Sequence, residues 1–401
     1  MPDLETFAQL FAAEHKADPY PRYRTWREQA PVTELAPGFL VVSGLAEATG
    51  VVRDPAFGHP RPEVVPLADR HPDDLVDDEG RPVVSFLGLN PPDHTRLRRL
   101  VSKAFTPRTI EQLRPRIEAI TARLISELLE AGTADLMTAL AAPLPVEVIS
   151  ELLGVPTADR SRFAEWSHAL ARALDPAFLV ADSVLEEAAV AGREFNAYFR
   201  LLAAERRRTP GEDLLSDLVA VTDQGDKLTE AELLVTLTLL LVAGHETTTN
   251  LIGNGVLALL RHDGLASLGP DGSSAERAVE EVLRYDSPVQ LTSRVALHPT
   301  TVGGLPVPAG TQAIVLIGAA NRDPATHPSP DTFDPTREPT RHLAFGQGIH
   351  FCLGAPLARL EGRTALRALA RRTPALTLAD TPSWNPTTTM RGLSKLPVSV
   401  R

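Results

Sequence analysis

The sequence predicts a mainly α-helical fold with a minor β-sheet, organised as one domain over residues 1–401. Three observations lead to this prediction. Apolar residues recur at helical spacing through most of the middle of the chain. Segments with strand character are few and short. No internal repeat, low-complexity tract or Gly/Ser-rich linker divides the chain into parts with independent cores.

The first predicted elements, in chain order, are a strand and three helices. Residues 38–42 form an apolar, β-branched run that is typical of a strand. Within residues 117–128, Ile and Leu recur at spacings of three and four, which predicts an amphipathic helix. Residues 146–153 and 184–202 show the same period and are also predicted to be helices.

The second half of the chain contains a long helix, a strand and a further helix. Residues 230–260 are apolar on nearly every side, which predicts a buried central helix. A Pro-Ala-Gly turn at 308–310 leads into a strand at 311–317, and a helical pattern occupies 355–368. Long loops are predicted at 58–82, 262–274 and 321–341.

Charge and composition exclude several classes of protein. The chain has 40 basic and 51 acidic residues and a formal net charge of −11, so bulk attraction to nucleic acid or an anionic membrane is not expected. The most apolar run, residues 233–243, is shorter than the ~20 residues that cross a bilayer. The N-terminal segment lacks the pattern of a secretory signal, so we expect a cytoplasmic protein. A single cysteine excludes an intramolecular disulfide and a multi-cysteine metal site.

That cysteine, Cys352, has unusual surroundings. A lone cysteine is more often a small buried apolar residue than a reactive group. Here Gly346 and Gly348 precede it and Gly354 follows it, so the backbone must turn tightly or let a large group approach. The start of the 355–368 helix would stabilise a thiolate. Such a thiolate fits a nucleophile, as in a cysteine hydrolase, or an axial ligand of haem iron.

The pattern Phe345-x-x-Gly348-x-x-x-Cys352-x-Gly354 resembles the haem-binding signature of the cytochrome P450 family. The resemblance extends over essentially the whole chain and is closest to the soluble bacterial members. It implies the cytochrome P450 fold, with haem b between the long central helix and the cysteine loop. It also implies that Cys352 is the iron ligand and that Phe345 belongs to the cofactor site.

A second motif, Ala243-Gly244-His245-Glu246-Thr247-Thr248, interrupts the apolar central helix. Polar groups at such a position require partners, and the alternatives are a solvent-facing notch or hydroxyls bonded to the preceding turn. By resemblance, Gly244 leaves a groove for O₂, and Glu246 and Thr247 are the catalytic pair that delivers protons to dioxygen.

Two further groups of residues match the family pattern. Glu281 and Arg284 are three residues apart, a spacing that is common on exposed helices, but the resemblance implies a buried structural network with Arg337. His94 and Arg98 share one helix face, which is most often simply solvated. The resemblance makes them ligands of the haem propionates. Two more propionate ligands are implied, Arg294 and His350.

The predicted function is a haem-thiolate monooxygenase that inserts one oxygen atom of O₂ into a hydrophobic small molecule, expected to be a secondary metabolite. No flavin or nicotinamide motif is present, so electrons are expected from a separate ferredoxin and ferredoxin reductase, and the enzyme is expected to be a monomer. Candidate docking cations for that partner are Arg96, Arg99, Lys103, Arg359 and Arg363. Candidate substrate-pocket residues are Phe86, Leu87, Leu89, Leu240, Ala243, Val289, Leu291, Met390 and Leu393.

Three alternatives use the same residues differently. A peroxide-driven peroxygenase or an oxidative-coupling enzyme would use the same haem site, although enzymes that use peroxide commonly lack the acid–threonine pair. A non-enzymatic haem-binding module would not need Glu246 and Thr247. An absorption spectrum distinguishes all haem proteins from a cysteine hydrolase.

Overall fold

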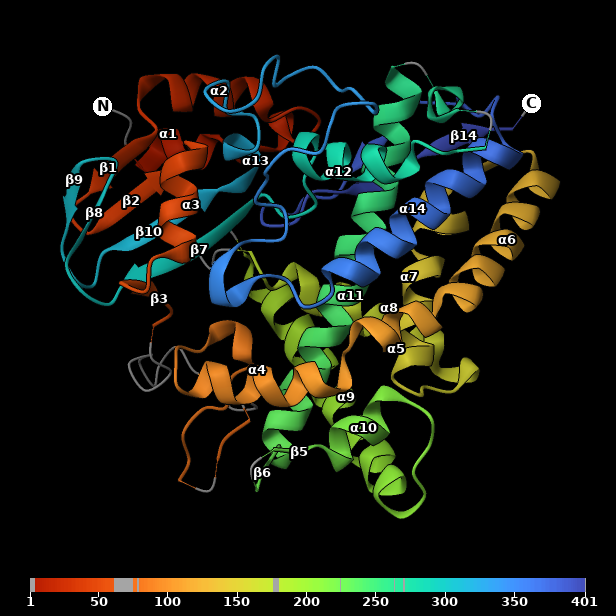
Figure 1. Cartoon of the computed structure of the whole chain (residues 1–401), viewed down its shortest axis with the longest axis horizontal. Helices are drawn as coiled ribbons and strands as arrows, with labels where there is room; N and C mark the ends of the chain where they lie inside the picture. The colour runs from red at the N-terminus through yellow and green to blue at the C-terminus, as the bar shows by residue number, and fades with distance from the viewer. Residues whose placement is uncertain are drawn as a thin grey trace. The chain divides into compact units, whose positions relative to one another are not determined.

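The computed structural model describes residues 4–60, 75–77, 79–175, 180–223, 225–262, 264–269 and 271–400 (Figure 1). The chain forms two compact units. Unit 1 comprises Met1–Gly58, Glu118–Leu144 and Thr247–Arg401, and unit 2 comprises His59–Ile117 and Pro145–Glu246. Helices α6, α7 and α11 contribute residues to both units. That residues 1–401 act as one domain stays a prediction.

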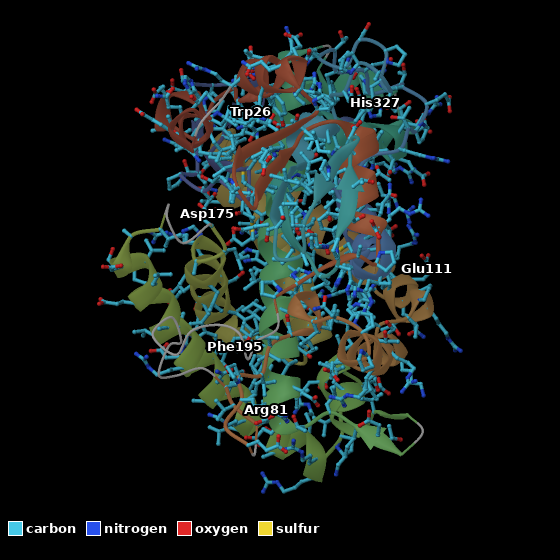
Figure 2. All side chains as sticks on the ribbon, turned by 90° about the vertical axis from the view of Figure 1, so that its left-hand side faces the viewer. Trp26, Arg81, Glu111, Asp175, Phe195 and His327 are labelled. Atoms are coloured by element: carbon cyan, nitrogen blue, oxygen red, sulfur yellow. The ribbon has the colours of Figure 1, made fainter. Side chains whose placement is uncertain are left out.

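Unit 1 contains a five-stranded mixed sheet in the order β1-β2-β10-β7-β3. Strand β10 runs parallel to β2 and antiparallel to β7. Apolar side chains cover both faces of the sheet because successive residues of a strand point to opposite sides. Helix α3 packs on one face, and α1 and α2 pack on the other, where Trp26 lies (Figure 2). The strands are β1 (Val32–Ala36), β2 (Phe39–Val42), β3 (Phe57–Gly58), β7 (Leu291–Ala296) and β10 (Gln312–Leu316).

The other elements of unit 1 are mostly helices that carry the candidate site. The helices of this unit, with the three shared ones, are α1 (Leu4–Gln9), α2 (Tyr20–Gln29), α3 (Leu45–Arg53), α6 (Arg114–Ala131), α7 (Pro143–Leu152), α11 (Glu230–Arg261), α12 (Ala275–Tyr285), α13 (Ile317–Ala320) and α14 (Ala355–Arg372). The small strands are β4 (Thr133–Asp135), β8 (Thr300–Val302), β9 (Leu305–Val307), β11 (Thr377–Leu378), β12 (Ser383–Trp384), β13 (Leu393–Lys395) and β14 (Pro397–Ser399).

Unit 2 is helical, with one small hairpin. A cluster of aromatic rings from α8 and α9 forms part of its core: Phe195 (Figure 2) lies 4.5 Å from Phe199 and 5.9 Å from Phe163, measured between ring centroids. These three side chains are fully buried, so α8 and α9 are held together by aromatic packing. The elements are α4 (Asp93–Ala104), α5 (Pro107–Gln112), α8 (Arg160–Arg172), α9 (Asp182–Arg208), α10 (Leu214–Ala220), β5 (Thr222–Asp223) and β6 (Asp226–Lys227).

The structure confirms the mainly helical fold class with a minor sheet. The predicted helices and strands correspond to α6, α7, α9, α11, α14, β2 and β10. The segment 321–341 contains no helix or strand, as expected, whereas the expected 262–274 loop includes a 3₁₀ turn at Leu265–Leu268. The expected 58–82 loop lies mostly outside the described residues. Among the helices that the structure describes, none is long and apolar enough to cross a membrane.

Candidate active site

The loop that carries Cys352 is folded by its own backbone hydrogen bonds. The N–H of Cys352 donates to the carbonyl of Phe345 at 2.9 Å, which closes the loop just before α14 begins. Gly348 has φ +71°, and a Cβ there would lie 2.9 Å from the carbonyl oxygen of Val52. Only glycine fits this conformation and this close approach. The loop therefore presents a half-buried Cys352 at a helix N-terminus, where its thiolate is stabilised.

Glu280 on α12 fixes the loop from both of its ends. Its carboxylate lies 3.2 Å from Nε2 of His342, before the loop, and 2.6 Å from Nε of Arg359, after it on α14. Burial alone would raise the pKa of Glu280, but these two hydrogen bonds lower it to about 2. The guanidinium of Arg359 also lies 4.5 Å from the centre of the Phe345 ring. Sequence reasoning missed Glu280, whose only signal is its place beside Glu281.

The next residue, Glu281, is the centre of a buried network. Both of its carboxylate oxygens accept from Arg284 at 2.8 Å, and one also accepts from Nε of Arg337 at 3.1 Å. Arg284 donates onward to the carbonyls of Pro330 and Asn321, in the segment that leads to the cysteine loop. The structure thus brings the three predicted network residues together and satisfies their charges. Because the side chains of Glu281 and Arg284 are each only 1% exposed, loss of either partner would leave a buried charge.

Arg294 on β7 is a buried cation without an acidic partner among the described residues. Its guanidinium donates to Oγ1 of Thr292 at 3.2 Å and to the carbonyl of Ser293 at 2.7 Å, and it forms no ion pair. Burial, with no nearby carboxylate to offset it, lowers the pKa of Arg294 to about 10. A buried guanidinium of this kind is stabilised by an anion, which the described residues do not supply. This donor fits a haem propionate, and the thiolate presented by the same unit fits the haem iron.

In unit 2, the predicted propionate ligands lie on α4. His94 is 3% exposed, and its ring centroid lies 6.4 Å from that of Phe86. The guanidinium of Arg98, one turn further along α4, lies 5.4 Å from the centre of the same Phe86 ring. The structure therefore places Phe86, a candidate pocket residue, beside both His94 and Arg98. His350 lies in unit 1, half-buried at the end of the Gly348–His350 turn.

The polar motif of α11 lies on a helix that has one face less buried than the others. Ala243 is exposed and Gly244 and Thr247 are half-buried, whereas Thr248 is only 2% exposed. A Cβ at Gly244 would lie 3.4 Å from Cδ1 of Ile149, an ordinary van der Waals contact, so α7 packs against α11 at this position. Sequence reasoning did not foresee this contact, and the groove for O₂ at Gly244 stays a prediction.

Glu246 is buried next to two histidines of unit 2. Its Oε1 lies 3.5 Å from Nδ1 of His168 on α8 and 3.7 Å from Nδ1 of His245. Burial alone would raise the pKa of Glu246, but these histidines hold it below its usual value. His168 was not recognised from the sequence, because nothing there indicates that α8 contacts α11.

The candidate pocket residues separate into two groups. Val289 and Met390 pair in an antiparallel bridge, and Cδ1 of Leu393 would lie 3.8 Å from a Cβ at Gly253 on α11. Leu291 is corrected: it belongs to the apolar core beneath α1 and α2, on the face of β7 opposite to Arg294, because strand residues alternate. In unit 2, Leu240 is buried, whereas Leu87 is 47% exposed and Leu89 is half-buried.

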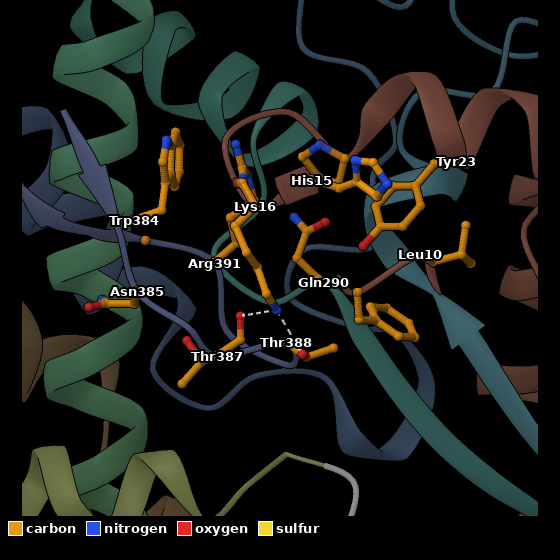
Figure 3. Close-up of a pocket in the computed structure, with 13 residues that line it drawn as sticks. Leu10, His15, Lys16, Tyr23, Gln290, Trp384, Asn385, Thr387, Thr388 and Arg391 are labelled. Carbon is orange, nitrogen blue, oxygen red and sulfur yellow. Dashed lines mark hydrogen bonds between the residues drawn. The ribbon is translucent and has the colours of Figure 1, made fainter. Parts of the chain in front are cut away.

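A separate pocket of unit 1 is lined by residues of the N-terminal and C-terminal segments (Figure 3). Lys16 reaches into it, and its Nζ donates to the carbonyl of Thr387 and to Oγ1 of Thr388, both at 2.9 Å. Arg391 lies beside it and donates to Oδ1 of Asp286 at 2.5 Å. Because a lysine side chain occupies this pocket, we assign it to the anchoring of the Met390 segment rather than to substrate.

Most of the predicted docking cations are already engaged within their own unit. Arg96 forms ion pairs with Asp226 and Glu232, and Arg359 is bound to Glu280. Arg363 lies 3.7 Å from Glu276, a looser and more exposed pair. The charges of Arg96 and Arg359 are therefore offset by nearby carboxylates, and a docking role for either stays a prediction.

Comparison with known proteins agrees with this site. The family model described as Cytochrome P450 matches residues 76–266 and 275–399. The chain is 43% identical to "Cytochrome P450 monooxygenase PikC" of Streptomyces venezuelae, over 100% of this chain and 94% of that protein. It is 41% identical to "6-deoxyerythronolide B hydroxylase" of Saccharopolyspora erythraea, over 99% and 98% of the two chains.

The solved structures show the same likeness. Ligand-free CYP164A2 of Mycobacterium smegmatis matches with a TM-score of 0.89 and 45% identity, covering 99% of this chain and 100% of that one. P450BioI, solved in complex with a fatty-acyl carrier protein, matches with a TM-score of 0.88 and 36% identity over 97% and 99% of the chains. The chain therefore belongs to the cytochrome P450 family, and it is a haem b monooxygenase with the Cys352 thiolate as its axial ligand.

Proposed function

We propose that this enzyme hydroxylates or otherwise oxygenates a hydrophobic secondary metabolite of the polyketide type. The names of its relatives support this class: PikC is a monooxygenase, and another relative, 45% identical over 79% of this chain, is "Polyketide biosynthesis cytochrome P450 PksS" of Bacillus subtilis. We assign Val289 and Met390, which pair in an antiparallel bridge, to the aliphatic wall of the substrate site. The substrate and O₂ are the reactants of the family's reaction.

The observation that carries the proposed site is the buried Arg294, which lacks an acidic partner among the described residues. In our proposal Arg294 and His350 in unit 1, and His94 and Arg98 in unit 2, hold the haem propionates. Phe345 packs beside Cys352 in the same loop. When bound, haem supplies dioxygen activation and the transfer of electrons, with the thiolate donating electron density to the iron.

The chain's own residues then have three tasks. Glu281, Arg284 and Arg337 hold the segment before the cysteine loop in one conformation. Glu246 and Thr247, consecutive on α11, move protons towards the site of oxygen chemistry, in the way of a general acid backed by a titratable group. Gly244 keeps the α11 surface open beside them.

We propose that electrons come from a separate ferredoxin and its reductase, and that the enzyme works as a cytoplasmic monomer. A ligating thiolate must stay reduced, which the cytosol favours. In this proposal the candidate docking cations include Arg99 and Lys103 on α4 and Arg363 on α14.

A spectroscopic screen tests the substrate proposal. Macrolide aglycones, fatty acids and steroids would be titrated into the purified haem protein while its low-spin to high-spin change is followed. We expect a saturable low-spin to high-spin change with polyketides. When ferredoxin, reductase and reduced nicotinamide are added, we expect a product that has gained one oxygen atom. Tight binding and oxygenation of fatty acids or steroids, with none for any polyketide, would overturn the substrate class.

A further inference from the structure

The acidic residue of α11 has a solvent-exposed partner that the family motif does not include. Glu246 is 8% exposed and lies within unit 2, where it contacts His168 on α8. Nδ1 of His168 lies 3.5 Å from Oε1 of Glu246, and 58% of the histidine side chain is exposed. One ring therefore contacts both a buried carboxylate and bulk solvent.

We propose that His168 is the residue through which Glu246 receives protons from solvent, so that its charge state controls how efficiently oxygen consumption leads to product. This inference rests on the proposed role of Glu246 in proton delivery. His168 acts through Glu246 and is a positioning and relay residue, not a catalytic one.

The charges around the pair favour this arrangement. The hydrogen bond to Glu246 raises the pKa of His168 despite partial burial, which opposes the shift. Arg172, one turn further along α8, lowers this pKa, and Glu187 on α9 raises it, but these two form their own ion pair at 2.8 Å. His245 is the other titratable group at Glu246. The pair thus favours a proton on His168 and a carboxylate at Glu246.

The proton transfer is balanced and needs no further reactant. The imidazolium of His168 gives the proton on Nδ1 to Oε1 of Glu246, which leaves a neutral imidazole and a carboxylic acid. The ring then turns so that the vacant Nδ1 faces solvent and takes up a proton from water, as in other histidine proton shuttles. No bond between heavier atoms forms or breaks, and the net result is one proton carried from solvent to the buried carboxyl group.

The first test observes the pair directly. Histidine labelled with ¹³C would be titrated by NMR in the holoenzyme, kept diamagnetic as its reduced carbon-monoxide complex. The pKa of His168 should lie above its ordinary value in the wild type and fall towards that value in Glu246→Gln. An unchanged His168 titration in Glu246→Gln would show that the two groups are not linked and would overturn the proposal.

The second test measures product formed per reduced nicotinamide between pH 6 and pH 9, with saturating redox partners. In the wild type this coupling should fall as His168 loses its proton. In His168→Gln the product formed per reduced nicotinamide should no longer change with pH and should stay at the low value that the wild type reaches at high pH. Haem content and substrate affinity should be unchanged. The control Arg172→Gln, on the same helix, should keep the step.

The outcomes separate the inference from the proposed function. Glu246→Gln could form less product per reduced nicotinamide while His168→Gln keeps the wild-type yield and its pH dependence. That result would overturn the role of His168 alone. Wild-type coupling in Glu246→Gln would remove Glu246 from proton delivery and overturn both.

Discussion

At the scale of single residues, the α11 motif distinguishes two adjacent threonines. Thr247 is half-buried on the less buried face of the helix, whereas Thr248 is 2% exposed and packed into the core. A step of one residue turns a helix by about 100°, so the two hydroxyls cannot serve the same site. In our proposal Thr247, and not Thr248, is the hydroxyl that takes part in proton delivery.

We predict that Thr247→Ala uncouples the enzyme rather than inactivating it. The variant should bind haem and substrate and should still consume electrons, but more of them should appear as hydrogen peroxide, because a misplaced proton donor changes which product is released. Product and peroxide per reduced nicotinamide are the measurements. Thr248→Ala is the matched control and should stay close to the wild type. Equal coupling in wild type and Thr247→Ala would revive the peroxide-driven alternative.

A second residue-scale prediction concerns His327, which is fully buried next to the Glu281 network. Burial, and then the charges of Arg284 and Arg337, lower the pKa of His327 to about 4, while Glu281 and Asp323 oppose the shift. The folded state therefore favours neutral His327. The contribution of neutral His327 to the free energy of unfolding is complete above pH 6.5. It is lost as the pH falls from about 6.5 to about 4, which lowers the free energy of unfolding by about 3 kcal/mol.

Denaturant unfolding between pH 4 and pH 8 checks this prediction. His327→Gln should lose less stability on acidification than the wild type does, because it removes the titrating group and keeps polar atoms near Thr340. The exposed His298 provides the control variant, His298→Gln, which should behave as the wild type. If wild type and His327→Gln lose equal stability, His327 is not the acid-sensitive group.

At the scale of elements, α12 holds the cysteine loop through two consecutive acids with different partners. Glu281 binds Arg284 and Arg337 beside the preceding segment, and Glu280 binds His342 and Arg359 around the loop itself. The resemblance to the family motif predicted the first set, which the spacing alone did not. The second set depends on how α12, the loop and α14 meet, which residue spacing does not reveal.

We predict that Glu281→Ala yields protein without haem or aggregated protein, because it leaves buried arginine charges at a cost of roughly 3–5 kcal/mol. Haem content per protein and thermal unfolding are the measurements. Glu276→Ala, on the same helix with a 74% exposed side chain, is the control and should retain haem. A soluble, fully loaded Glu281→Ala with normal melting would contradict a structural role for the network.

At the scale of the whole molecule, the long periodic helices were predictable and the sheet was largely not. Helix α11 was visible because its apolar pattern extends over many turns, whereas β7 is short and buried on both faces, so it lacks a clear alternation. Leu291 also lies on this strand. Because side chains alternate along a strand, Leu291 lies on the face opposite to Arg294, which explains why its assignment to the substrate pocket was in error. The pairing of His168 with Glu246 joins distant segments and could be found only in the folded chain.

The measurement that tests the central claim most directly is the absorption spectrum of the reduced carbon-monoxide complex, recorded for wild type and for Cys352→His. The wild type should show the strongly red-shifted Soret band of thiolate ligation. Cys352→His should show a blue-shifted band and little oxygenase activity, since a neutral imidazole replaces the electron-donating thiolate. A red-shifted band that persists in Cys352→His, or a purified wild-type protein that takes up no haem, would contradict the account.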